Sequence, residues 1–89
     1  MKKRKFKKKK DIAFNKVYEK HVDEIYRICL HYSRDEKIAQ DATVQVFFDL
    51  YQVFEEIDEE FYRAYLVLGA KELAEKYKEE KISGEEERV

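Results

Sequence analysis

The sequence predicts an all-α domain, a three-helix antiparallel bundle. Apolar residues recur at helical spacing through most of the 89 residues. No stretch alternates apolar and polar residues as a half-buried strand does, and the chain contains no proline. The segments between the apolar stretches are short, so consecutive helices are expected to pack side by side.

Charge divides the chain into a basic head and an acidic body. Residues 1–10 hold eight Lys or Arg and no acid, so eleven basic residues face all twenty acids in the remainder, a net charge of −9. We predict a disordered basic head at 1–10, a helical domain at 11–82 and a frayed acidic tail at 83–89. The head is either solvated, able to hold RNA, DNA or an acidic protein surface, or folded back on the acidic body of its own chain.

The first helix is expected to run from Asp11 to Tyr32. Its broad apolar face consists of Phe14, Val17, Tyr18, His21, Ile25, Ile28, Cys29 and Tyr32. Ser33 then begins the sequence SRDE, in which a hydroxyl is followed three residues later by the Glu36 carboxylate. This spacing is typical of a capping box at the start of the next helix.

The second helix, Asp35 to Val53, has two faces that differ in character. The expected core face consists of Ala39, Thr43, Val46, Phe47, Leu50 and Phe54. The opposite face consists of Asp41, Val44, Gln45, Phe48 and Gln52. A face that meets only water is not expected to place Val44 and Phe48 one turn apart, so we predict that this side binds a partner protein.

The third helix is expected to begin after Asp58 as its N-cap, to run to Lys81 and to be ended by Gly84. Its inner face consists of Tyr62, Leu66, Gly69, Ala70, Leu73 and Tyr77. Glycine inside a helix costs up to about 1 kcal/mol relative to alanine. We therefore predict that another helix crosses closely at Gly69.

The order of these helices resembles region 2 of bacterial RNA polymerase sigma factors, especially the extracytoplasmic-function group. The stretch FNKVYEKHVDEIYRICLHYSRDE resembles the opening helix of that family, AQDATVQVFFDLY its second helix and FYRAYLVLGAKELAEKYKEEK its third. The resemblance covers residues 14–81. It implies a transcription initiation protein whose second helix docks on the clamp helices of the largest subunit of core RNA polymerase.

The resemblance also assigns site residues. Asp41 stands where the family has its docking Asp, whereas Val44 and Gln45 replace a Gln and a Glu. The implied polymerase-binding set is Asp41, Val44, Gln45, Phe48, Tyr51 and Gln52.

In the family, the third helix and the link before it read the minus-ten element of the promoter. Phe61 and Tyr65 can stack on unpaired bases, or they can pack against the first helix instead. The acids Glu72 and Glu79 share a lateral stripe, where they oppose contact with phosphates. Contact with promoter DNA is therefore expected to be weak or indirect. The residues assigned to it are Phe61, Tyr65, Lys71 and Lys76.

A complete sigma factor has a second domain with a helix-turn-helix, for which no residues remain. We expect a fragment or a domain that borrows a DNA-reading partner protein; an anti-sigma factor is a further candidate partner. The alternative is a sigma-like regulatory binding protein that has lost DNA contact and sequesters a partner or dimerises through Val44 and Phe48. A third hypothesis is a generic helical module whose basic head binds RNA.

No motif indicates an enzyme or a cofactor, because the sequence has no Gly-rich phosphate loop, no HExxH and no nucleophile elbow. His21, Cys29 and His31 do not converge on one helical face, so we predict no metal site. The single cysteine cannot form an internal disulfide. No apolar run approaches the roughly 20 residues of a membrane span. We therefore expect a cytoplasmic protein with no membrane contact.

Overall fold

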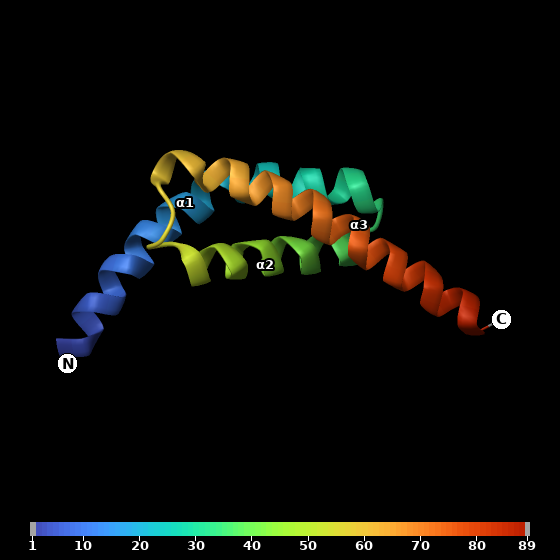
Figure 1. Cartoon of the computed structure of the whole chain (residues 1–89), viewed down its shortest axis with the longest axis horizontal. Coiled ribbons are helices and arrows are strands. Elements are labelled where there is room, and N and C mark those ends of the chain that lie inside the picture. The colour runs from blue at the N-terminus through green and yellow to red at the C-terminus, as the bar shows by residue number, and fades with distance from the viewer. Residues whose placement is uncertain (1, 89) are drawn as a thin grey trace.

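The computed structural model describes the backbone of residues 2–88 and the side chains of residues 9–84. The elements are α1 (Lys2–Ser33), α2 (Glu36–Val53), the short 3-10 helix η1 (Glu59–Phe61) and α3 (Tyr62–Arg88). The described backbone contains no strand, which confirms the all-α prediction. α2 runs back along α1, and α3 returns in the direction of α1 (Figure 1).

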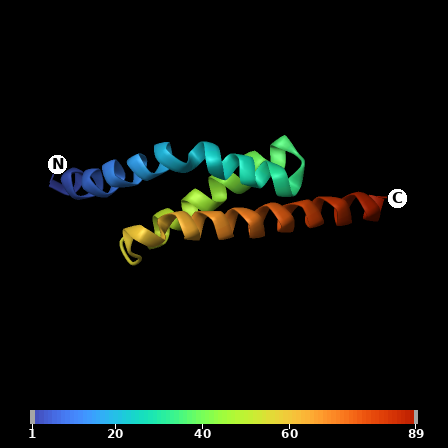
Figure 2. The same cartoon turned by 90° about the horizontal axis from the view of Figure 1, so that it is seen from above.

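Each helix packs against the other two. Seen from above, α2 runs obliquely to α1 and α3 (Figure 2), and it lies beneath both of them in the first view (Figure 1). The first turns of α1 and the last turns of α3 extend beyond the packed region at opposite ends of the molecule, which measures 55 × 27 × 20 Å (Figure 1). The helical bundle is thus built from the middle of the chain.

The core face predicted for α2 is confirmed, because all six of its residues are buried. They are Ala39, Thr43, Val46, Phe47, Leu50 and Phe54. Ile25 and Cys29 reach them from α1, and Leu66 and Ala70 from α3. Ala74 is also fully buried, although the sequence pattern did not place it on the inner face of α3.

An aromatic cluster closes the end of the bundle where α2 finishes. The Phe14 ring meets the Tyr51 ring edge-on, with centroids 5.1 Å apart, and the Phe54 ring at 5.4 Å. Phe54 in turn stacks on Tyr62 of α3, with centroids 4.6 Å apart. Edge-to-face and stacked pairs at these separations stabilise beyond their buried area, by about 0.5–1.5 kcal/mol each.

Gly69 lies where α2 and α3 approach closely, as predicted. A Cβ atom at Gly69 would stand 2.5 Å from the Cγ2 atom of Val46, closer than two carbon atoms can approach without rearrangement. The absence of a side chain at Gly69 therefore permits α2 and α3 to pack closely. This packing offsets the cost of glycine within a helix.

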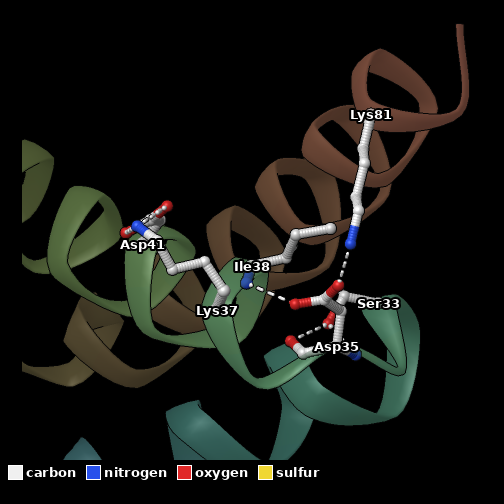
Figure 3. A network of polar contacts seen from close by, with 6 residues as sticks. All are labelled: Ser33, Asp35, Lys37, Ile38, Asp41 and Lys81. Carbon is white, nitrogen blue, oxygen red and sulfur yellow. Dashed lines mark hydrogen bonds and ion pairs between the residues drawn. The ribbon is translucent and has the colours of Figure 1, made fainter. Parts of the chain in front are cut away.

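The turn between α1 and α2 differs from the predicted capping box. Asp35, not Ser33, is the N-cap of α2, and its Oδ1 accepts a hydrogen bond from the Ile38 amide at 3.1 Å. The Ser33 hydroxyl instead accepts from the Asp35 amide at 3.3 Å. Lys81 of α3 reaches the other Asp35 oxygen at 2.5 Å, so α3 is tied to this turn (Figure 3).

The turn also contains a left-handed residue. Arg34 has a φ of 57°, and its amide donates to the Leu30 carbonyl at 2.8 Å. This geometry ends α1 in the αL conformation, a position that glycine usually occupies. Asp58 similarly precedes η1 rather than α3, and its side chain makes no capping hydrogen bond.

Both terminal helices are longer than predicted. α1 begins at Lys2 instead of Asp11. α3 does not end at Gly84 as predicted but continues to Arg88. Lys, Arg and Glu are good helix formers, so the helical register continues beyond the packed core at both ends. Gly84 has no positive φ and therefore does not act as a helix stop.

Candidate protein-binding face of α2

The outward side of α2 exposes two large apolar side chains one turn apart. Val44 is 70% exposed and Phe48 is 57% exposed, whereas the neighbouring Phe47 is only 3% exposed. Val44 is the most exposed of the seven large apolar residues that are exposed in the described part of the chain. We call the surface formed by Asp41, Val44, Phe48 and Gln52 the outer face of α2.

Polar groups border these two apolar side chains. Asp41 is exposed and pairs with Lys37 one turn earlier, at 3.2 Å. Gln52 is exposed as well. Gln45 is half-buried on the side toward α3 and donates to an Asp49 carboxylate oxygen at 2.8 Å. Apolar side chains at the centre with polar groups at the edge are the usual arrangement of a protein interface.

Tyr51 lies apart from the other residues of the predicted polymerase-binding set, because it is engaged by α1. Its hydroxyl donates to Asp11 at 2.7 Å, and this bond is the first cause of a raised Tyr51 pKa. The ring contacts Phe14, and the Lys10 ammonium lies 4.0 Å from the ring centroid. Tyr51 therefore holds α1 against α2, while the other predicted residues remain on or beside the outer face.

A hollow between α1 and α2 extends the apolar surface beside Val44. Val44, Tyr18, Val22 and Tyr26 contribute its apolar part. Polar groups also line it, among them Arg27. Tyr18 was predicted to lie in the core, yet it is 42% exposed at this edge. Val22 and Tyr26 are site candidates that sequence reasoning missed, because they lie beside the apolar face assigned to the first helix and not within it.

The aromatic residues assigned to DNA contact meet at one hollow near the start of α3. Phe61 is 54% exposed and is not among the residues packed on the core, whereas Tyr65 is half-buried beside the core. The hollow is also bordered by Glu56 and Asp58. Burial raises the pKa of Tyr65, and the nearby Asp49 raises it further. Carboxylates therefore surround the two rings, where a bound strand would place phosphates.

The two lysines assigned to DNA contact lie on different sides of α3. Lys71 lines a hollow toward α1, with its ammonium 5.7 Å from the Tyr32 ring centroid. Lys76 lines the groove toward α2, together with Glu72 and Glu79. The structure thus does not bring Lys71 and Lys76 together into one basic surface.

Two of the residues considered for a metal site, Cys29 and His21, make other contacts in the structure. Cys29 is fully buried, and its thiol donates to the Ala70 carbonyl at 3.8 Å. Burial raises the pKa of this thiol. His21 is half-buried, with Nδ1 3.9 Å from a Glu24 carboxylate oxygen. Among the side chains that the structure describes, no group of three metal-ligating residues comes together.

One cross-link between α1 and α3 had no sequence signal. Arg63 donates through Nε to Glu24 at 3.1 Å and through a second nitrogen to the other carboxylate oxygen. The first cause of the lowered Glu24 pKa is this hydrogen bond with Arg63. The pair joins residues 39 positions apart, and neither residue belongs to an apolar face predicted from the sequence.

Comparison of the chain with protein-family models, with curated proteins and with solved structures found no match. In a separate test of the described helices, none was long and apolar enough to cross a membrane.

Proposed function

We propose that this chain is a sigma region 2-like transcription initiation protein that docks on the clamp helices of core RNA polymerase. The docking surface is the outer face of α2. The observation that carries the proposal is the exposure of Val44 and Phe48 on a helix whose other side is fully committed to the core. Asp41, at the position of the family's docking Asp, is on the same face and accessible.

The contact would join α2 to a coiled coil through helix packing. Full burial of a Val or Phe side chain contributes about 1.5–3 kcal/mol. Loss of one such anchor corresponds to roughly tenfold or more in affinity. Asp41 and Gln52 at the edge would fix orientation and exclude other partners rather than supply most of the free energy.

A binding assay with the isolated clamp-helix coiled coil tests this proposal. The wild-type chain should be retained by the immobilised coiled coil, and Phe48→Ala should weaken binding by about tenfold or more. Asp41→Ala should have a smaller effect. Leu68→Ala is the matched control, because Leu68 is 61% exposed but lies on α3. Lack of binding by the wild-type chain, with helicity intact by circular dichroism, would contradict the proposal.

The surroundings of Phe61 and Tyr65 favour a second version, a sigma-like regulatory protein that has lost DNA contact. Glu56 and Asp58 border their hollow, and Asp49 lies near Tyr65. In this version the outer face of α2 sequesters a partner protein or dimerises through Val44 and Phe48.

Fluorescence anisotropy with labelled minus-ten single strands separates the two versions. Sequence-dependent binding that weakens with salt and with Tyr65→Ala would support direct promoter contact. Binding to no strand, while the clamp-helix contact persists, would support the version without DNA contact.

A further inference from the structure

A second surface of the molecule is the groove between α2 and α3, on the other side of α2 from Tyr51. Its volume is about 750 Å³. Apolar side chains from both helices lie within it: Val46, Tyr65, Leu68 and Leu73. Leu68 is 61% exposed, so the groove offers apolar area to an incoming side chain.

The groove is negatively charged. Four acids line it, and Lys76 is the one base, which leaves a net charge of −3. The acids are Asp49, Glu72, Glu75 and Glu79. Among the side chains described, none of the three glutamates takes part in an ion pair. A ligand that offers cations around an apolar group would therefore complement both features of the groove.

The chain itself contains a segment of this chemistry. The head, residues 1–10, has eight Lys or Arg around the single aromatic Phe6 and no acid. Its backbone from Lys2 continues α1 outward, away from the packed region (Figure 1). Because α1 is one uninterrupted helix, the head is directed away from the groove of its own molecule. Apart from Lys10, which contacts Tyr51 and Glu55 of its own molecule, the head is therefore placed to meet the groove of another.

We infer that the groove between α2 and α3 binds the basic head of a second copy of this chain. The contact joins the positive head of one molecule to the acids at Glu72 and Glu79 of the other, with Phe6 placed against the apolar lining. Since head and groove are different surfaces, one molecule can donate its head while its own groove accepts another. This inference does not depend on polymerase docking, because the groove and the outer face of α2 are separate surfaces.

Sedimentation velocity of the full chain tests the inference. At low ionic strength the average mass should rise with protein concentration, and salt should reduce this association by screening the charges. Glu72→Lys with Glu79→Lys should weaken self-association by about tenfold or more, because like charges opposed across an interface disfavour binding. The matched control is Glu19→Lys with Asp23→Lys, which changes net charge equally at exposed positions of α1 outside the groove.

A complementation experiment identifies the head as the occupant. A head variant, Lys5→Glu with Lys8→Glu, should be monomeric, as should the groove variant. Their mixture should associate, because the intact head of the groove variant meets the intact groove of the head variant.

Three results would overturn the inference. One is that the full chain stays monomeric at high concentration and low salt. This result counts against the inference even if the head of that monomer binds an RNA oligonucleotide. Another is equal weakening by the α1 control. The third is a mixture of the two variants that stays monomeric although each variant is helical by circular dichroism.

Discussion

At the scale of single residues, the contact between Gly69 and Val46 limits how closely α2 and α3 can approach. Gly69→Ala should destabilise the fold by about 1–2 kcal/mol, because overpacking costs about 1–3 kcal/mol and the gain in helix propensity returns at most about 1. Urea denaturation followed by circular dichroism measures the change.

Gly84 provides the control for this substitution. Nothing lies within 4 Å of a Cβ atom placed there, so Gly84→Ala should leave stability unchanged or raise it slightly. If Gly69→Ala instead leaves stability unchanged or raises it, as expected for Gly84→Ala, then α2 and α3 do not cross as closely at Gly69 as described.

Phe47 and Phe48 are neighbours in sequence with opposite surroundings. Phe47→Ala should cost about 3–5 kcal/mol, because it removes a buried ring from the core. Phe48→Ala should change the free energy of unfolding by no more than about 0.5 kcal/mol, since its ring is mostly in water. Equal losses in chemical denaturation would mean that α2 is rotated relative to the structure described.

At the scale of elements, two carboxylates with lowered pKa values bind side chains of α3: Asp35 at the start of α2, and Glu24 within α1. Asp35 is held ionised first by Lys81 and then by the Ile38 amide, and Glu24 first by Arg63. Because the folded-state pKa values lie below the ordinary 3.8 and 4.5, both groups stabilise the fold above those values. This contribution is lost as the pH falls through the lowered folded-state values.

Thermal melts of the wild type and of Asp35→Asn test the linkage. At neutral pH the variant should melt at a lower temperature, since the amide loses the charge that Lys81 pairs with. Once the pH falls below the lowered folded-state pKa of Asp35, the two melting temperatures should converge, because the wild-type carboxylate is then protonated as well. A constant difference across this range would show that charge at Asp35 does not matter.

The six predicted core residues of α2 and the exposure of Val44 and Phe48 could be predicted from its sequence, because its apolar positions follow the helical period and the two faces are separate. The turn before it could not. Ser33 and Asp35 are both good capping residues, and local sequence does not decide between them. The decisive partner, Lys81, lies 46 residues away. The left-handed conformation of Arg34 could not be predicted either, because the position is not occupied by glycine, the usual residue in that conformation.

At the scale of the whole molecule, the sequence predicted the bundle but not the surfaces between helices. The hollow beside Val44 depends on the rotation of α1 about its axis. Tyr51 of α2 packs against α1 through contacts with Asp11 and Phe14, which are 40 and 37 positions away in the sequence. The acidic groove combines Asp49 of α2 with glutamates of α3. Such sites depend on the packing angle between helices, which apolar periodicity within one helix does not determine.

Cys29 reports on the opening of the whole bundle. It is fully buried between helices, and its raised pKa leaves little of the reactive thiolate. Its reaction with a thiol reagent should be slow in the native protein and should accelerate with denaturant in step with global unfolding. Rapid labelling without denaturant would indicate that α1 separates from the bundle readily.

We propose that the outer face of α2 docks a partner protein. An NMR titration with the clamp-helix coiled coil tests this contact residue by residue. Amide signals of Asp41, Val44, Phe48 and Gln52 should shift or broaden on addition of the coiled coil, whereas those of Leu68 and Lys71 on α3 should not. A spectrum that stays unchanged at saturating coiled coil, or changes confined to α3, would contradict the proposal.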